Sequence, residues 1–286
     1  MDTAINALFQ ILSFSSIMVL IVIGLGVVAS MMNIFNFAHG EFVLLGAYFT
    51  YVFHNHGVPI AAAMALAPMV VALIGWLVER TVIRWFYARP LIAMLGTYAL
   101  SVVIRESVRG LLGGLYENVP APLTGSFVVD GIAFAQWRIA IIVITILVIA
   151  ASGALLTMTS FGLRVRASLE NPALARASGI STGAIYAATF TFGVALAGLA
   201  GALVVPIFSL FADLGLRFLI QAFLAVMVGG IGTFAGPLVG AGVIGTLTSA
   251  LPWVISPVLA DVLVFIIAIG LMKALPAGIV RARHRV

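Results

Sequence analysis

Residues 11–32 read ILSFSSIMVLIVIGLGVVASMM, and residues 33–40, which follow, read NIFNFAHG. The first run has no charged side chain and is long enough to cross a bilayer, which requires about 20 apolar residues. The second run interrupts the apolar sequence with asparagine, histidine and glycine. No basic segment precedes the first run and no small-residue cleavage site follows it, so we expect a transmembrane helix and not a cleaved signal peptide.

The composition extends this interpretation to the whole chain of 286 residues. Hydrophobic residues make up 63% and charged residues 8%, and the mean hydropathy is +1.25. Soluble domains carry about 25% charged residues, so these values exclude a soluble globular domain, and they equally exclude a disordered chain. The apolar residues suffice for at most about nine spans. We therefore expect a single transmembrane domain over residues 1–286.

Cysteine content and net charge exclude further classes of protein. The chain has no cysteine, so disulfides, thiolate metal sites and a cysteine nucleophile are impossible. The net charge of +5 could indicate a nucleic-acid partner. In a membrane protein, however, an excess of Lys and Arg is expected in cytoplasmic segments. We therefore expect a lipid bilayer around the chain and no nucleic-acid partner.

Apolar stretches of spanning length predict the positions of most helices. The candidate spans are residues 8–32, 60–79, 91–113, 138–159, 183–209 and 257–275. Two further regions fit less simply. Residues 41–57 form a short apolar stretch, whereas residues 218–251 are too long for one span and contain GGIGTFAGP at 229–237. We expect an all-α polytopic fold with about eight membrane helices and two broken or re-entrant regions.

Basic residues indicate which loops face the cytoplasm. Ten of the 14 basic residues lie in three short segments, and they are Arg80, Arg84, Arg89, Arg164, Arg166, Arg176, Lys273, Arg281, Arg283 and Arg285. The positive-inside rule places these segments on the cytoplasmic side. Residues 114–137, with Glu117 and Asp130, then lie outside, as does the loop near Asp213. The N-terminus is expected outside. Residues 218–251 are expected to start and end outside, as two short tilted helices or a re-entrant pair that turns at the glycine-rich break.

The two breaks in the apolar pattern are candidates for a transport pathway. Interrupted helices are tolerated in a bilayer only where protein or water satisfies the backbone, and such interruptions point to transport sites. The candidate pathway residues are Asn36, His39, Gly40, Glu41, Gly229, Gly230, Gly232, Thr233 and Gly236. In a simpler interpretation, Asn36 and His39 bond to the broken backbone near the cytoplasmic interface, and Glu41 favours the N-terminus of the next helix.

The most informative cytoplasmic loop is residues 161–181, which read FGLRVRASLENPALARASGIS. Pro172 fits the first turn of a short helix, with Asn171 as its N-cap. Gly179 fits the position just after the C-cap. A short surface helix that exposes Ala and Arg suits docking into a groove of another protein.

This loop resembles the coupling loop of permease subunits of ATP-binding-cassette (ABC) importers. It is similar to that of branched-chain amino acid permeases at Gly162, Arg164, Arg166, Ala167, Asn171, Ala175, Gly179 and Ile180. Residues 36–42 and 46–48 resemble the first broken region of that family, and residues 229–237 with Gly240 resemble the second. A fourth, weaker match to the family covers Glu79-Arg80 together with residues 89–91. The resemblance thus extends from residue 36 to residue 240.

The resemblance implies a non-catalytic chain that forms the translocation pathway for branched-chain or related amino acids in the bacterial inner membrane. It implies a second permease subunit in a heterodimer, two cytoplasmic ATPase subunits and an extracytoplasmic substrate-binding protein. ATP would be used by those partners, and this chain would bind no cofactor. The absence of a GxxxxGK[ST] motif agrees with this. The loop at about 160–182 would dock on the ATPase through Gly162, Arg164, Arg166, Ala167, Glu170, Asn171, Ala175, Arg176 and Gly179.

Two alternatives remain open at this point. Permeases for urea and short amides share the same four motifs, so the substrate class is not decided by them. A self-sufficient channel or secondary carrier without an ATPase is a different class, but such a protein has no need of a coupling loop. No HExxH motif or pair of carboxylates marks an intramembrane enzyme.

Charged residues in the span 91–113 and two neighbouring histidines also require an interpretation. Arg105 lies about 14 residues, or roughly 21 Å, into an outward helix and is therefore near the outer boundary. Arg105 and Arg109 share a face and could meet a carboxylate substrate or the binding protein; alternatively, Arg105 is an outer-leaflet anchor paired with Glu106.

His54 and His56 have no further ligand nearby, so we expect an outer loop and no metal site.

Overall fold

The computed structural model describes all residues except 1, 33–34, 88, 130 and 281–286, and the described chain is mostly helical, as predicted. Seven described helices, two of them extended by a short 3-10 helix, are long and apolar enough to cross a membrane. They are α1 (Asp2–Met32), α3 (Ile60–Thr81), α4 (Pro90–Leu112), α5 (Gln136–Met158), α8 (Thr182–Val204), α10 (Ala235–Ala250) and α11 (Pro257–Ala274). Two shorter apolar helices, α2 (His39–Asn55) and α9 (Leu214–Gly229), complete the bundle. The second predicted broken region therefore forms two helices, α9 and α10.

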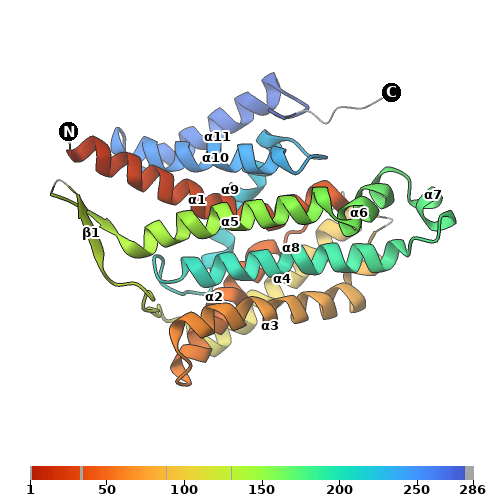
Figure 1. The fold of residues 1–286 in the computed structure, drawn as a ribbon, viewed down its shortest axis with the longest axis horizontal. Coiled ribbons are helices and arrows are strands. Elements are labelled where there is room, and N and C mark those ends of the chain that lie inside the picture. Colours follow the sequence, from red (N-terminus) through yellow and green to blue (C-terminus); the bar gives the residue numbers. More distant parts are fainter. Residues whose placement is uncertain (1, 33–34, 88, 130, 281–286) are drawn as a thin grey trace.

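The long helices run side by side between two ends of the molecule (Figure 1). One end carries the N-terminus and the hairpin of β1 (Ser126–Val129) and β2 (Ile132–Ala135). The other end carries α6 (Ser160–Glu170) and α7 (Pro172–Ala177), which hold basic residues. By the positive-inside rule this second end is cytoplasmic, and we call it the inner end and the opposite one the outer end. Of the topology residues, Asp130, Arg281, Arg283 and Arg285 lie outside the described part of the chain.

The β-hairpin was not predicted, because an all-α fold was expected to have an irregular loop at residues 114–137. Its strands pair antiparallel, with Ser126 opposite Ala135 and Val129 opposite Ile132. The strands are rich in Val, Ile and Phe, which favour extended backbone, and Gly131 in the turn has φ +80°. The hairpin extends from the outer end of α5 (Figure 1) and is too short to cross a membrane.

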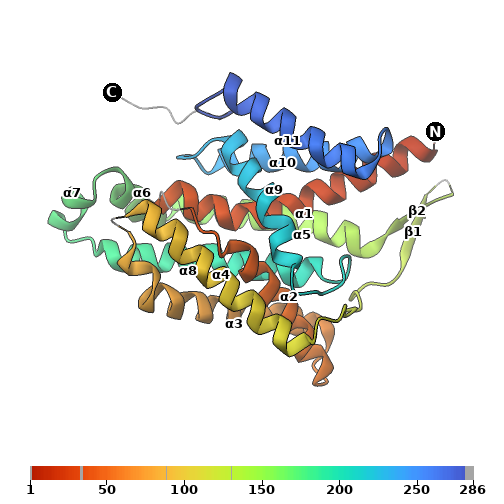
Figure 2. The same cartoon turned by 180° about the vertical axis from the view of Figure 1, so that it is seen from behind.

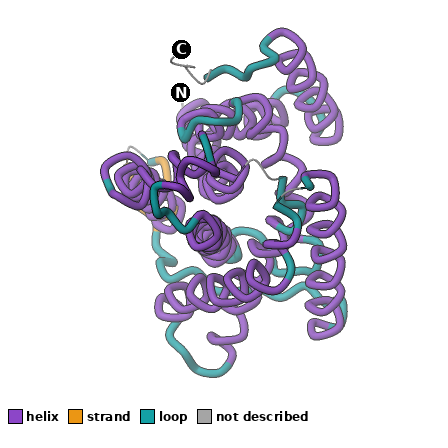
Figure 3. The backbone as a smooth tube through the Cα atoms, turned by 90° about the vertical axis from the view of Figure 1, so that its right-hand side faces the viewer, coloured by secondary structure: helices purple, strands orange, loops and turns teal. Residues whose placement is uncertain are grey.

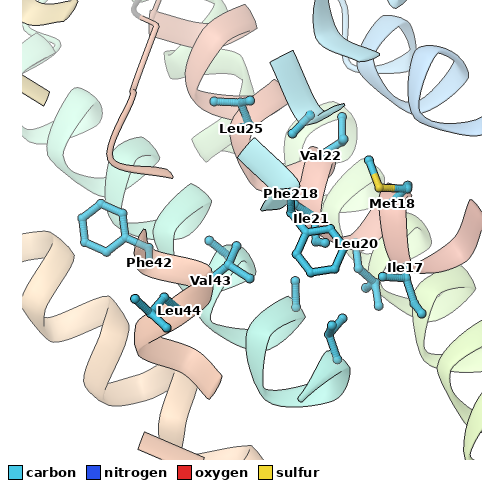
Figure 4. Close-up of a cluster of buried hydrophobic side chains, with 14 of the residues drawn as sticks. Ile17, Met18, Leu20, Ile21, Val22, Leu25, Phe42, Val43, Leu44 and Phe218 are labelled. Atoms are coloured by element: carbon cyan, nitrogen blue, oxygen red, sulfur yellow. The ribbon is translucent and has the colours of Figure 1, made fainter. Parts of the chain in front are cut away.

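The core of the bundle lies where α1 and α8 meet the two short helices. Figure 4 shows Ile17, Met18, Leu25 and neighbouring side chains of α1 beside Phe42 of α2 and Phe218 of α9, all buried. A helix that is apolar on all sides must be surrounded by other elements. This is the case for α1, which contacts α5, α8, α9 and α10. Figure 3 shows the chain from one end, with most of its helices seen along or close to their axes.

Glycines bring α8 close to its neighbours. A Cβ atom at Gly201 would collide with the carbonyl oxygen of Val43 in α2, and one at Gly46 would collide with that of Gly198 in α8. A Cβ at Gly193 would lie 2.8 Å from the carbonyl oxygen of Gly24 in α1. Small residues at such crossings allow backbones to approach closely, as is common in membrane proteins. Their positions fix how α1, α2 and α8 pack.

The helix boundaries differ from the predicted spans at two places. The apolar stretch 183–209 predicted one long helix, but α8 ends at Val204 and a turn follows. Pro206 accounts for the difference, since proline cannot continue a helix without losing a hydrogen bond. At the N-terminus, α1 starts at Asp2, ahead of the predicted residue 8. The short 3-10 helices η1 (Ile83–Trp85) and η2 (Leu251–Trp253) follow α3 and α10.

Candidate functional site

The segment formed by α6 and α7 extends from the inner end of the bundle (Figure 1). The predicted caps of α7 are confirmed: the Asn171 side chain accepts a hydrogen bond from the Leu174 amide at 3.0 Å, Pro172 is the first helical residue, and Gly179 has φ +82°. The residues before Asn171 are also helical, so the predicted loop contains two short helices. We call residues 160–182 the coupling segment.

The residues expected in the coupling segment divide into two structural groups. Gly162 and Ala175 are buried, and a Cβ at Gly162 would collide with the backbone of Leu156 at the end of α5. Ala167 is partly exposed and lines a cavity of about 760 Å³ together with Ile180 of the turn before α8. These residues shape the segment and hold it against the bundle.

The second group projects into solvent. Arg164, Glu170 and Arg176 are exposed, and the Leu174 side chain is 63% exposed although it is apolar. The Arg166 guanidinium is exposed as well, but it also donates a hydrogen bond to the Leu156 carbonyl oxygen. A variant at Arg166 would therefore disturb the attachment of the segment, whereas variants at the other four would alter its surface.

The first break, at residues 35–38, runs back into the bundle before α2 begins. Asn36 satisfies the local backbone, since its side-chain oxygen accepts a hydrogen bond from the Ala38 amide at 3.0 Å. His39 Nε2 donates to the Ile21 carbonyl oxygen at 3.0 Å. Ile21 lies about 16 Å before the inner end of α1, so His39 is deep in the bundle. The expectation that it lies near the cytoplasmic interface is wrong, because the extended segment carries α2 inward from that interface (Figure 2).

Five charged residues form a chain of ion pairs between α2, α4 and the start of α9. Glu41, which is fully buried, lies 3.7 Å from Arg105, and Arg105 lies 4.0 Å from Asp213. Asp213 is 2.8 Å from Arg109, which also pairs with Glu106 at 3.7 Å. The predicted pairing of Arg105 with Glu106 is wrong, because adjacent residues point to different faces of a helix. The pairs become more buried from Asp213, which is 48% exposed, toward Glu41.

The second break forms the turn between α9 and α10 at the inner end. Gly230 and Gly232 have φ values of +99° and +96°, and Thr233 Oγ1 accepts a hydrogen bond from the Gly236 amide at 3.0 Å. The backbones of Gly229 and Gly236 are so close that a Cβ at Gly229 would collide with the Gly236 carbonyl oxygen. The predicted turn at this position is confirmed.

Three cavities lie in a row along one face of α9. The outer cavity, of about 320 Å³, is lined by Arg217, Ile220 and Gln221 of α9, together with Asp261 of α11 and residues from α1, α10 and η2. The middle cavity, of about 390 Å³, is lined only by apolar side chains: Phe35, Phe37, Met94, Ile220, Phe223, Leu224 and Met227. The inner cavity, of about 440 Å³, includes Phe35, Met227, Gly230 and Met272.

Of the predicted pathway residues, Gly230 lines one of these cavities, whereas His39 and Glu41 are buried between helices. The sequence analysis did not single out Arg217 and Phe223, which line the outer and middle cavities. The available signal was the spacing of exposed residues along α9, where Arg217, Ile220 and Met227 recur at helical intervals. That spacing defines one face of a helix, but it does not distinguish a cavity from lipid.

The two outer histidines bond to nearby backbone. His54 Nδ1 donates to the Val58 carbonyl oxygen at 3.3 Å, and His56 Nδ1 donates to that of Val52 at 2.8 Å. Among the described residues, no group of three or more His, Asp or Glu side chains is placed to hold a metal ion. These histidines terminate α2 at the outer end.

Residues 7–272 match the protein family described as "Branched-chain amino acid transport system / permease component". The chain belongs to this family. The resemblance first noted in the coupling segment and the two breaks is thereby confirmed. The protein is a multi-pass permease subunit of the inner membrane in an ABC transport system, and it is not itself an enzyme.

Curated relatives cover almost the whole chain. The high-affinity branched-chain amino acid transport system permease protein LivH of Escherichia coli K12 is 25% identical, over 96% of this chain and 94% of the relative. BraD of Pseudomonas aeruginosa, a permease of a high-affinity branched-chain amino acid system, is 28% identical over 94% and 92%. A probable LivH of Methanocaldococcus jannaschii is 26% identical over 93% and 89%. No solved structure matches the chain.

Proposed function

We propose that this permease transports branched-chain or similar hydrophobic amino acids as one half of a heterodimer with a second permease subunit. Two cytoplasmic ATPase subunits bind beneath the pair, and an extracytoplasmic binding protein delivers the substrate. The observation that carries the proposal is the coupling segment. It extends from the basic, inner end of the bundle with four charged side chains and the apolar side chains of Leu163 and Leu174 exposed.

The surface of α7 supports docking on an ATPase subunit. Leu174 is exposed among the small residues of α7, and an apolar side chain near Arg176 and Glu170 suits a groove that buries it. The caps at Asn171 and Gly179 make α7 rigid, so little conformational entropy is lost on docking. A self-sufficient channel or carrier has no use for such a segment.

The substrate proposal is supported by the middle cavity and by the substrate class named for LivH and BraD. An aliphatic side chain gains roughly 25 cal/mol for each Å² of apolar area that it buries. Urea or a short amide has no such area and would lose hydrogen bonds to water in a cavity lined only by apolar side chains. The cavity therefore favours hydrophobic amino acids over urea and amides.

The docking proposal is tested with the double variant Leu174→Asp/Arg176→Glu in the assembled transporter. We expect the permease to fold, but the ATPase subunits to co-purify at least tenfold less and uptake to fall by the same factor. Val128→Asp is the matched control, since Val128 is similarly exposed on the outer hairpin. The control should retain the ATPase subunits. Normal recovery of ATPase subunits with the double variant would contradict the docking surface.

The substrate is tested by uptake into vesicles that contain the complete transporter and its binding protein. We expect ATP-dependent uptake of L-leucine and no uptake of ¹⁴C-urea. Uptake of urea in preference to L-leucine would overturn the substrate class while leaving the assembly proposal intact.

A further inference from the structure

We propose that the face of α9 from Arg217 to Met227 is the wall of the substrate pathway, and that Arg217 and Asp261 at its outer mouth bind the charged head of a zwitterionic amino acid. This inference rests on the proposed function, because it assigns the substrate of that transporter to a particular surface. The proposed residues, on α9 and at Asp261, lie outside the sequence motifs of the two breaks.

The three cavities along α9 form one continuous series. Ile220 lines the outer and middle cavities, and Met227 and Phe35 line the middle and inner ones. The outer cavity is next to the start of α11 at the outer end, and the inner one is next to Leu275 and Gly278 beyond the inner end of that helix. The series therefore connects the two ends of the bundle along a single helix face.

The opposite face of α9 is packed into the core. Phe218, Ala222 and Ala225 are buried, whereas Arg217, Ile220 and Met227 are exposed in the isolated chain. In Figure 2, α9 crosses the molecule obliquely between α11 on one side and α2 and α4 on the other. The exposed face lies between these helices, and the second permease subunit is expected to close it.

The outer cavity offers opposite charges that are not paired with each other. Within the described residues, neither Arg217 nor Asp261 takes part in an ion pair, although both line this cavity. The Arg217 guanidinium lies over the Phe208 ring, 5.3 Å from its centroid, which orients it. Gln221 Oε1 and Thr248 Oγ1, in the same lining, have no hydrogen-bond partner in the described part of the chain.

A zwitterion fits this arrangement. Arg217 can donate two hydrogen bonds to an α-carboxylate in a bidentate pair, and Asp261 can accept from an α-ammonium. The free oxygen atom of Gln221 is a further acceptor for the three N–H bonds of that ammonium. Urea and amides carry no charge, so they would not compensate either side chain.

The middle cavity would receive the apolar side chain and resist the charged head. The rings of Phe37 and Phe223 lie 4.9 Å apart between centroids, and those of Phe35 and Phe223 lie 5.9 Å apart. A charge at this apolar position is not solvated. The lining therefore disfavours the charged head, which would stay at the outer mouth while the apolar side chain enters the cavity.

The pathway is tested with single cysteines, which the cysteine-free chain makes possible. Cysteine replaces Ile220, Phe223 or Met227 in the complete transporter, and a small, positively charged methanethiosulfonate reagent is the probe. We expect modification in at least one nucleotide state, slower modification when L-leucine and the binding protein are present, and loss of uptake after modification. Val262→Cys on α11, exposed but outside the three cavities, is the control and should show no protection.

The outcomes separate this inference from the proposed function. If all three cysteines are unreactive in every nucleotide state while L-leucine uptake is normal, the face is a dry helix interface or a lipid surface, and the inference is overturned. If the cysteines react but L-leucine neither slows the reaction nor is transported, the proposed substrate is wrong.

The outer mouth is tested separately with Arg217→Gln and Asp261→Asn. We expect each variant to lower L-leucine uptake at least tenfold while the ATPase subunits remain bound to the permease. Arg217→Lys keeps the charge and should restore part of the uptake. Glu106→Gln, an exposed acidic residue at the same end outside the three cavities, is the matched control. Unchanged uptake in both charge-removing variants would overturn the assignment.

Discussion

At the residue scale, the buried pair of Glu41 and Arg105 illustrates how a membrane protein retains a charge in its core. Glu41 has no exposed surface, and neither carboxylate oxygen has a hydrogen-bond partner among the described residues. The negative charge of Glu41 is compensated by the Arg105 guanidinium, which lies 3.7 Å away. The Arg105 side chain is 11% exposed. Removing one partner of a buried pair costs more than the pair contributes, because the other charge remains desolvated.

We therefore predict that Arg105→Leu destabilises the folded permease by about 3–5 kcal/mol. Arg109→Leu should cost only about 0–1 kcal/mol, because Arg109 and Asp213 are 43% and 48% exposed. The measurement is thermal unfolding of the purified transporter in detergent. The double variant Glu41→Gln/Arg105→Leu should regain most of the lost stability. Equal losses for the two single arginine variants would contradict the role of burial.

A second residue-scale prediction concerns Tyr87, in the cytoplasmic loop after η1. Its hydroxyl donates a hydrogen bond to Glu79, which is buried at the end of α3. Burial, together with this hydrogen bond, raises the pKa of the Tyr87 hydroxyl above its ordinary value. The unfolded chain loses that proton above about pH 10 whereas the folded chain keeps it. The contribution of Tyr87 to stability is therefore present below pH 10 and is lost as the pH rises further.

Tyr87→Phe should accordingly cost about 1–3 kcal/mol at neutral pH, since Glu79 loses its donor. Above about pH 10, the difference in stability between Tyr87→Phe and the original protein should shrink. Thermal unfolding measured across this pH range is the test. A difference that is independent of pH would show that the hydroxyl ionises at the same pH in the folded and unfolded states.

At the element scale, the glycines of α8 set the distance between helices. A side chain at Gly201 would meet the Val43 carbonyl oxygen, which is backbone and cannot move aside. At Gly242 of α10, in contrast, a Cβ would have no described atom within 4 Å apart from the backbone of its own helix. Overpacking a core typically costs about 1–3 kcal/mol, and more where backbone must shift.

We predict that Gly201→Val lowers the amount of folded transporter at least several-fold, whereas Gly242→Val leaves it near the original level. The same substitution at two glycines of membrane helices controls for the change in helix propensity. Size-exclusion chromatography of detergent extracts, with the permease carrying a fluorescent tag, measures the folded fraction. Similar yields for the two variants would mean that α2 and α8 can separate at little cost.

The elements also show what the sequence could predict and where it could not. Apolar length predicted most of the spans, and the residues Asn171, Pro172 and Gly179 predicted α7 with its caps, because these signals are local. The ion pair between Glu41 and Arg105 joins residues far apart in the chain, so no local pattern reveals it. The cavities along α9 depend in the same way on where α4 and α11 lie.

At the scale of the whole molecule, the orientation in the membrane connects the coupling segment to the substrate pathway. The outer cavity can receive substrate from a binding protein only if the hairpin end is outside. The coupling segment can reach an ATPase only if the opposite end is in the cytoplasm. Both requirements follow from one orientation, which the distribution of Arg and Lys favours. An inverted chain would satisfy neither.

This orientation can be measured with single cysteines at the two ends, since the chain contains none of its own. Phe127 of the hairpin and Leu174 of α7 are 55% and 63% exposed, so a cysteine at either position should react with a maleimide that reaches it. In intact cells that express the permease without its ATPase subunits, a membrane-impermeant maleimide should label Phe127→Cys, and it should label Leu174→Cys only after the membrane is permeabilised. Ala197→Cys, buried in α8, should react only after denaturation. Labelling of Leu174→Cys in intact cells would place α7 outside, where no ATP-hydrolysing subunit could bind it.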